Sequence, residues 1–384
     1  MKRMTSGILL LLFFLCGAPF TVFAQDGTDA QGEMQKQLLE DSADRVQQSG
    51  APLTSFQFSE TAQKVAEGEW EWNIANVLNR IADLFLGEVR SNLSALLKII
   101  VIAVLAGILC NLQGPFNGEG VADVSFLVCF IVIAGLAVSV FAEIVQTAMG
   151  TIDSLTLFMQ GLIPSMTGII AAGGGAASGM ALSPSLFLCM QVITYLAKNV
   201  FLPMILVITA LSVINNMSGR FHITKLIEFA RQALKWSSGI LLTVFIGILS
   251  LQGFSSAFVD GVAGKTVKYA ICNFVPLVGN VLSDSVEAVC ASTVVVKNAV
   301  GITGVLALLS ICVGPLLKLL AISVLYRFAA GVAEPATDRR IVNLLGDLAG
   351  NITQTFVILL MVCVMFIISV AMLCAVTNIP MMMR

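Results

Sequence analysis

The sequence predicts an all-α membrane protein: a polytopic bundle of about six transmembrane helices and two broken or re-entrant segments, after a cleaved signal peptide. Its 384 residues are 57% hydrophobic and only 11% charged, with a mean hydropathy of +0.93. Soluble proteins carry about 25% charged residues, so lipid must cover much of this surface. Several apolar segments reach the roughly 20 residues needed to cross a bilayer, and basic residues cluster between some of them.

The first residues predict a signal peptide. Lys2 and Arg3 form a short basic head, an apolar run follows at 8–16, and small residues surround the end of this region. This order is typical of a secretory signal that is cleaved, here after Ala24. We therefore expect a signal peptide over 1–24, with an uncleaved membrane anchor as the alternative.

Residues 25–92 predict a polar, extracytoplasmic N-terminal segment. They are acidic and rich in glutamine at first, and from Trp70 onward apolar residues recur near helical spacing. The stretch after Trp70 predicts a helix. It would either lie at the membrane interface or dock on a partner as a soluble amphipathic helix.

Residues 93–384 predict the transmembrane domain. Two shorter stretches, 155–178 and 268–292, begin apolar, contain Pro164 and Pro276, and end in small or polar residues. We expect both to be broken or re-entrant helices buried in protein, with two additional full spans as the alternative. The expected spans cover residues 93–113, 124–148, 184–214, 236–258, 300–327 and 352–377.

Basic residues between the spans predict the orientation. The positive-inside rule places their loops in the cytoplasm. Counting spans from an exported residue 25 gives the same answer and puts the C-terminus outside. The two basic clusters are Arg220, Lys225, Arg231 and Lys235, and Arg327, Arg339 and Arg340.

An internal repeat over 126–236 and 238–350 is a further hypothesis. A shift of 112 residues superposes glycines and prolines, although the overall identity under that shift is near chance. The repeat would be parallel, because the basic loops fall on the same side. The recurring prolines are Pro164 and Pro203, matched by Pro276 and Pro315.

Two lysines, Lys198 and Lys318, lie deep inside predicted spans. A charge at membrane depth costs several kcal/mol unless it is paired or wetted, so we expect both to face a polar cavity or a partner subunit. Glu143 and Asp153 are expected instead to reach the interface from helix ends. The candidate cavity or partner contacts are Lys198, Pro203, Lys318, Pro315, Pro164 and Pro276.

The stretch from Arg220 to Trp236 predicts a basic amphipathic helix. It would lie on the inner leaflet, or its basic face would dock a cytoplasmic partner. The expected apolar face carries Leu226, Phe229, Ala230, Ala233 and Leu234, and the opposite face Lys225, Glu228, Arg231, Gln232 and Lys235.

No catalytic, cofactor-binding or metal site is predicted, and we expect the chain not to be an enzyme. Gly264-Lys265-Thr266 lacks the earlier glycine that a phosphate-binding loop needs. The single histidine, His222, lies in a basic loop, and the nine cysteines show no C-x-x-C pair or zinc spacing. We expect these cysteines to be packing residues.

The block 251–304 carries specific motifs. They are Leu251-Gln252-Gly253, Asp260-Gly261, Lys265-Thr266, Asn273-Phe274-Val275-Pro276, Gly279, Lys297-Asn298 and Gly301, and the final Met381-Met382-Met383-Arg384 accompanies them. Together with the plan of signal sequence, polar ectodomain and multiple spans, they make the chain resemble the stage III sporulation protein AE family of endospore-forming bacteria.

This resemblance implies a permease-like membrane subunit of a channel or secretion-like complex. In that family the mother cell makes the complex, which joins mother cell and forespore during engulfment, so the implied location is the mother-cell membrane surrounding the forespore. The implied partners are the lipid bilayer, other stage III sporulation A proteins including a secretion-type ATPase, and, indirectly, stage II sporulation protein Q. No cofactor or nucleic acid is expected. A self-sufficient secondary transporter of a small solute is the alternative.

Overall fold

The computed structural model describes residues 74–113, 119–173, 176–217, 223–274 and 279–376, and this part of the chain is helical apart from short turns. The expected signal peptide lies outside these residues, as do the first 49 residues of the polar segment. The described elements are α4 (Ile74–Gln113), α5 (Glu119–Ala172), α6 (Ala176–Leu196), the π-helical turn η1 (Ala197–Phe201), α7 (Leu202–Met217), α8 (Thr224–Phe274), α9 (Gly279–Ala333) and α10 (Arg339–Val376).

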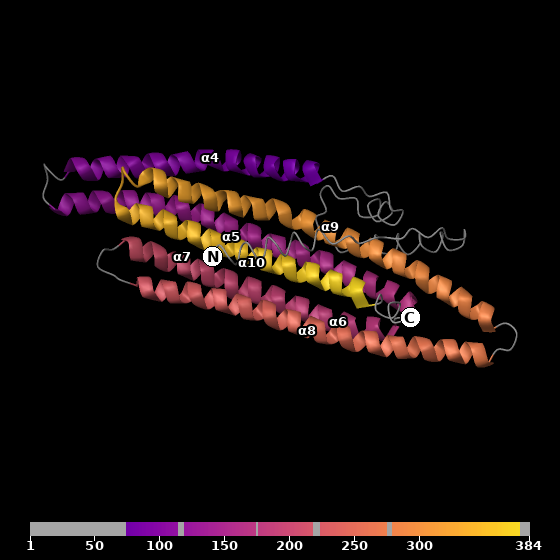
Figure 1. Cartoon of the computed structure of the whole chain (residues 1–384). Coiled ribbons are helices and arrows are strands. Elements are labelled where there is room, and N and C mark those ends of the chain that lie inside the picture. The colour runs from indigo at the N-terminus through magenta and orange to yellow at the C-terminus, as the bar shows by residue number, and fades with distance from the viewer. Residues whose placement is uncertain (1–73, 114–118, 174–175, 218–222, 275–278, 377–384) are drawn as a thin grey trace.

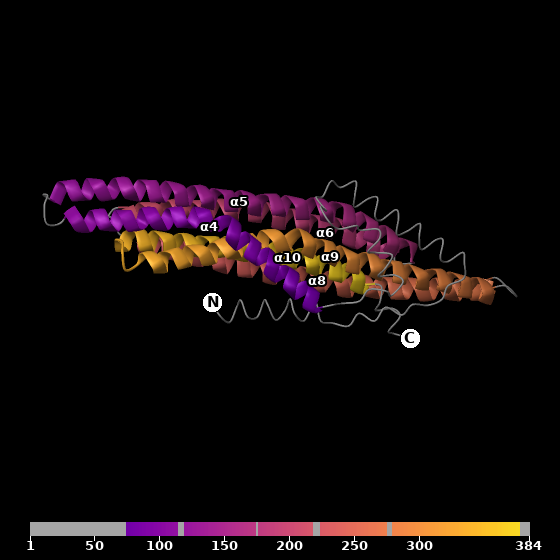
Figure 2. The same cartoon turned by 90° about the horizontal axis from the view of Figure 1, so that it is seen from above.

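The helices form an elongated bundle in which neighbours along the chain run antiparallel (Figures 1 and 2). α6, η1 and α7 together make one rod. The junctions α4–α5, α7–α8 and α9–α10 lie at one end, on the left in Figure 1, and α10 ends at the other. The two predicted basic clusters flank the last two of these junctions, so the described members of both gather toward the same end, as the orientation argument requires.

α10 forms the centre of the bundle. It packs most extensively against α9 and also contacts α5, α7 and α8. Its sequence from Phe356 to Cys374 is apolar on all sides, which is typical of a helix that other helices surround. Asp338 caps its start, because the Asp338 carboxylate accepts a hydrogen bond from the Arg340 backbone N–H at 2.8 Å. Pro335, just past the end of α9, prevents that helix from continuing.

α5 continues without a break through Pro164, so the prediction of a separate broken or re-entrant segment at 155–178 is wrong. The helix has 54 residues and is about 81 Å long. A proline removes one backbone hydrogen bond, and membrane helices tolerate it when nearby hydroxyls support the backbone. Pro164 leaves the Gln160 carbonyl without its partner, and Ser165 Oγ donates to the adjacent Gly161 carbonyl at 2.9 Å. Thr167 Oγ1 donates toward the carbonyls of Ile163 and Pro164, at 3.0 and 3.1 Å.

The second predicted broken segment, 268–292, is also not a separate element. Its first part is the end of α8 and its last part the start of α9, and these two helices form a hairpin that projects beyond the neighbouring helix ends (Figure 1). Pro276 itself lies outside the described residues. α9 has 55 residues, about 82 Å, far more than the roughly 30 Å of a hydrocarbon core.

Within the described residues, five helical stretches are long and apolar enough to cross a membrane. The predicted spans 124–148, 184–214, 236–258, 300–327 and 352–377 fall in or overlap them, and the remaining predicted span, 93–113, lies within α4. α4 continues without interruption across the expected boundary at residue 92. The five stretches are Leu127–Ala172, Leu182–Met217, Thr224–Gln252, Ser292–Ala333 and Arg339–Ala375.

A disulfide joins Cys312 of α9 to Cys363 of α10, so the prediction that the cysteines are simple packing residues is wrong for this pair. The prediction used spacing along the chain, and these two cysteines are 51 residues apart. They meet because α9 and α10 are adjacent antiparallel helices. Cys129, Cys189 and Cys374 are free.

Glycines allow the helices to approach closely, as is common in membrane proteins. A Cβ at Gly304 of α9 would lie 2.8 Å from Leu162 Cδ2 of α5. A Cβ at Gly107 of α4 would overlap the carbonyl oxygen of Ala336, in the turn between α9 and α10. Beside it, Thr337 Oγ1 donates to the Ala103 carbonyl at 2.8 Å. α4 is therefore held against this turn.

Gly107→Ala should detach α4 from the α9–α10 turn, because the obstructing atom is backbone and has little freedom to move. We expect a loss of about 1–3 kcal/mol, seen as a lower Tm in detergent. Gly87→Ala is the matched control on the same helix: nothing lies within 4 Å of its Cβ, and we expect unchanged or slightly higher stability. Equal Tm values for the two variants would contradict this packing.

Candidate functional site

Two lysine–carboxylate pairs lie within the candidate membrane spans. Lys198 Nζ donates to Asp153 Oδ1 at 2.5 Å, and Lys318 Nζ donates to Glu143 Oε1 at 2.8 Å. Each pair joins α5 to a different neighbour, the α6–η1–α7 rod in the first case and α9 in the second. The sequence therefore identified the lysines but not their partners.

The prediction that Glu143 and Asp153 lie near helix ends is wrong. Because α5 runs unbroken over Glu119–Ala172, Glu143 comes 24 residues after its start and Asp153 comes 19 residues before its end. These offsets are about 36 and 29 Å along the helix. Both carboxylates consequently sit far from either end of α5 and rely on their lysines for neutralisation.

Both pairs lie on the outside of this bundle rather than in its core. The Glu143 and Asp153 side chains are 65% and 51% exposed, whereas Lys318 and Lys198 are 24% and 29% exposed. A carboxylate facing hydrocarbon is costly even when it is paired on one side. The two carboxylates therefore form an exposed polar surface on this side of α5.

Lys198 occupies a distorted part of its helix. It lies in η1, where the Leu202 backbone N–H bonds to the Ala197 carbonyl, five residues earlier. Pro203 follows directly. A proline has no N–H and its ring collides with the carbonyl four residues back, so a wider π-turn relieves the strain. Pro203 thus explains why the helix widens where Lys198 points toward α5.

The predicted site residues do not form one cluster. Lys198 and Lys318 contact carboxylates ten residues apart on α5, about 15 Å along its axis. Pro315 lies inside continuous α9, three residues before Lys318, and Pro164 lies inside α5. The structure therefore gives two separate ion pairs in place of one cavity between broken helices.

A second polar cluster, which the sequence analysis missed, joins α7, α8 and α10. Arg231 of α8 donates through Nη1 and Nη2 to Asp347 Oδ1, both at 3.0 Å, and through Nε to Asn351 Oδ1 at 3.1 Å. From α7, Asn216 Nδ2 donates to Asp347 Oδ2 at 2.9 Å. Asn351 Nδ2 donates in turn to Thr209 Oγ1 at 2.9 Å. Every member is thus bonded to another helix.

This Arg231 cluster is largely shielded from the surroundings. Asn351 is 1% exposed and Asn216 7%, while the Arg231 and Asp347 side chains are about a quarter exposed. The sequence indicates the Arg231 cluster only weakly. Asp347 and Asn351 are four residues apart, as are Ser212 and Asn216. That spacing places each pair on one helix face, but nothing in it identifies Arg231 as the partner.

The prediction of a separate amphipathic helix with Arg231 on its polar face is wrong. Arg231 is committed to Asp347, and residues 224–236 are the first turns of the 51-residue α8. Leu226 and Phe229, expected on the side facing the leaflet, are indeed 54% and 69% exposed, but Leu234 is fully buried. Lys235 remains exposed.

Lys297 of α9 also lies within a candidate span, and it is almost completely buried, at 1% exposure. Its Nζ donates to the carbonyl oxygen of Cys374 at 2.6 Å, two residues before the end of α10. A cation at a helix C-terminus is stabilised by the unsatisfied carbonyls there. Lys297 therefore anchors α9 to the last turn of α10.

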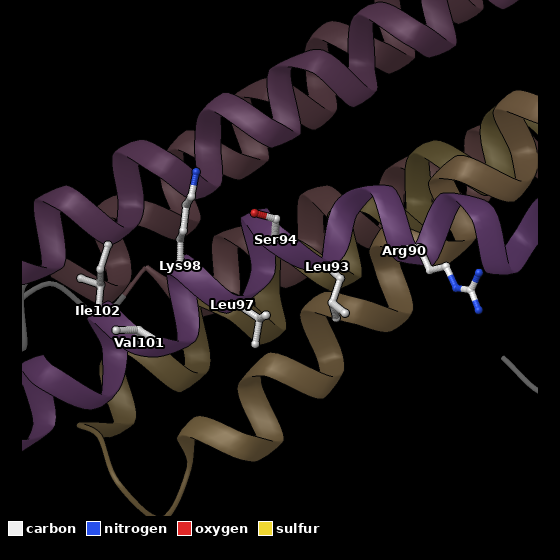
Figure 3. A pocket seen from close by; sticks show the side chains of 7 residues that line it. All are labelled: Arg90, Leu93, Ser94, Leu97, Lys98, Val101 and Ile102. Atoms are coloured by element: carbon white, nitrogen blue, oxygen red, sulfur yellow. The ribbon is translucent and has the colours of Figure 1, made fainter.

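An open groove of about 600 Å³ runs along α4 (Figure 3). Its side chains come from this one helix and are mostly apolar, with Arg90 and Lys98 pointing away from each other. Sites that enclose a small molecule draw on several elements and surround the ligand, so the groove is a surface feature of α4. Its lining residues are Arg90, Leu93, Ser94, Leu97, Lys98, Val101 and Ile102.

Comparison with known proteins decides the family. The family model for stage III sporulation protein AE matches residues 56–377. The chain belongs to the stage III sporulation protein AE family. It is 26% identical to stage III sporulation protein AE of Bacillus subtilis (strain 168) over 400 residues, covering the full length of both chains. Membership implies a role in sporulation and confirms the resemblance seen in the sequence. No solved structure matches the chain.

Asp347→Ala should destabilise the α7–α8–α10 junction by about 2 kcal/mol, because it leaves a shielded guanidinium and the Asn216 amide without their acceptor. Tm in detergent measures this. Glu228→Ala is the matched control on α8: Glu228 pairs with Lys225 at 3.0 Å, but Lys225 is 92% exposed, so its loss should change stability by well under 1 kcal/mol. Indistinguishable Tm values would show that the Arg231 cluster contributes nothing to stability.

Proposed function

We propose that this chain is a non-enzymatic, permease-like membrane subunit of a mother cell–forespore channel or secretion-like complex, required for sporulation after engulfment. Membership of the stage III sporulation protein AE family supports the sporulation role. The observation that carries the subunit role is the position of the two ion pairs, Lys198–Asp153 and Lys318–Glu143, on the outside of the bundle and within helical stretches apolar enough to cross a membrane.

The lysines alone do not fully stabilise the Asp153 and Glu143 carboxylates. A surface ion pair is weak in water and is unfavourable against hydrocarbon, where neither charge is fully solvated. A subunit that works in an assembly solves this, because neighbouring protein or enclosed water covers the polar surface. A chain that works alone in lipid would leave half of each carboxylate exposed to acyl chains.

The proposal includes the topology and location expected from the sequence. With α4 counted beside the five apolar stretches, about six spans place the basic ends in the cytoplasm and the α8–α9 hairpin outside it. The membrane is the mother-cell membrane surrounding the forespore. The partners are other stage III sporulation A proteins, including the secretion-type ATPase, and indirectly stage II sporulation protein Q. Lys235, exposed at the basic end, is a candidate cytoplasmic contact.

The alternative of a self-sufficient transporter is not supported. It depended on two broken segments that form one substrate site around Lys198 and Lys318. α5 is continuous through Pro164, and the two lysines belong to separate ion pairs. The inverted or broken-helix architecture typical of such sites is therefore not what carries these charges.

Deletion of the gene in its native host should stop sporulation after engulfment is complete. Engulfment is followed with a membrane dye, and spores are counted after heat treatment. Complementation with the wild-type gene should restore heat-resistant spores. Normal numbers of heat-resistant spores from the deletion strain would rule out a required subunit.

Lys318→Met should abolish complementation, because it leaves the Glu143 carboxylate unneutralised at membrane depth. The double variant Lys318→Met, Glu143→Met removes both charges and should recover the protein level in membranes but not spore formation. Lys98→Met, which removes an exposed lysine of α4, serves as the control for loss of one positive charge. Full sporulation by the double variant would mean that the pair is only structural.

A further inference from the structure

The outward face of α5 carries a row of exposed residues at alternating spacings of three and four. We call this row the α5 stripe. All of its members are exposed, and it runs over 22 residues, about 32 Å along the helix axis, which is close to the thickness of a hydrocarbon core. Its members are Ser139, Glu143, Gln146, Gly150, Asp153, Leu157 and Gln160. In Figure 2, α5 runs along one edge of the bundle.

The α5 stripe differs from the other exposed faces of the bundle. Of its seven residues only Leu157 is aliphatic. Beside exposed lysines such as Lys235 and Lys98, α8 and α4 expose many large apolar residues, which suit lipid. They include Leu226, Phe229, Trp236, Ile240, Val244 and Leu251 on α8, and Leu93, Leu97, Val101, Leu105 and Ile108 on α4. One side of the molecule is therefore unsuited to hydrocarbon while others suit it well.

The charges of the stripe are neutralised within the chain. Lys318 reaches Glu143 from α9, and Lys198 reaches Asp153 from η1. The stripe as a whole thus carries no excess charge to attract a cationic or anionic partner. What remains unsatisfied are the amides of Gln146 and Gln160, for which no hydrogen bond exists among the described residues.

We propose that the α5 stripe is the contact between two parallel copies of this chain. Membrane topology forces copies to be parallel, and a two-fold axis along the bilayer normal places each residue opposite its counterpart. A primary amide both donates and accepts, so Gln146 and Gln160 each complement themselves across such an axis. Interhelical bonds of this kind hold membrane helices together.

The geometry of the stripe suits two helices in contact. Alternating spacings of three and four are typical of the residues at the contact between two α-helices that wind around each other in a left-handed supercoil. Gly150 lies in the middle, and a Cβ built there would meet nothing within 4 Å, so packing within the chain does not require a glycine. A glycine at the contact lets two backbones approach closely. Since each carboxylate keeps its own lysine, the repulsion between like charges across the axis is weakened.

Cysteine cross-linking in membranes of a non-sporulating bacterial host tests the pairing. The full chain with Gly150→Cys should give a covalent dimer on mild oxidation, because disulfides need Cα atoms within about 7 Å. Ile240→Cys, exposed on α8, is the matched control and should stay monomeric, as should the chain with native cysteines alone. No other sporulation protein is present, so the result is independent of the proposed complex.

Gln146→Leu combined with Gln160→Leu gives a second readout. We expect the full chain to lose its dimer in detergent, measured by sedimentation, while its Tm stays near the wild-type value. Three outcomes overturn the proposal. Modification of Gly150→Cys by a membrane-impermeant maleimide without cross-linking indicates a water-lined surface. When the experiment is repeated in the sporulating native host, cross-linking only to a different protein indicates a hetero-oligomer. Absence of both reactions in the non-sporulating host indicates lipid contact.

Discussion

The bundle depends on one constraint: inside the hydrocarbon core, a polar or charged side chain must be satisfied by another helix, because no water is available. Four cations within the candidate spans follow it. Lys198 and Lys318 reach carboxylates on α5, Lys297 reaches the last turn of α10, and Arg231 reaches Asp347. These bonds fix which helices are neighbours and at what height they meet, something that apolar packing alone specifies poorly.

The polar contacts divide into two kinds, and the division links fold to function. The Arg231 cluster and Lys297 are shielded and connect α10 to the helices around it, so they hold the fold together. The two ion pairs on α5 are half exposed and hold little of the interior. Residues that a fold does not need, in a place where lipid disfavours them, indicate that the protein meets something else there. Such a surface is expected of a subunit and is a burden for a helix bundle that acts alone.

Much of this architecture follows from composition and from the length of apolar runs. The low content of charged residues and the positions of basic loops predict a helical membrane protein with its basic ends together. The prolines account for the main wrong prediction. Pro164 predicts a broken helix, and the helix continues through it. Whether a helix survives a proline depends on packing and hydroxyl support from elsewhere, which a single sequence does not contain.

The polar sites were predicted only in part for the same reason. Lys198 and Lys318 stood out because a lysine in an apolar run is rare, but their partners on α5 were assigned to helix ends by the false break at 155–178. Arg231 and Asp347 lie 116 residues apart and meet only when α8 and α10 are packed.

The π-turn at η1 adds one residue to a helical turn. One extra residue in a helical turn rotates every later residue by about 100° about the helix axis. The direction of Lys198 toward α5 is therefore set independently of the direction of Asn216 toward α10. Natural removal of a single residue near 197–201 would keep every hydrophobic segment intact and yet turn one of these two contacts out of register.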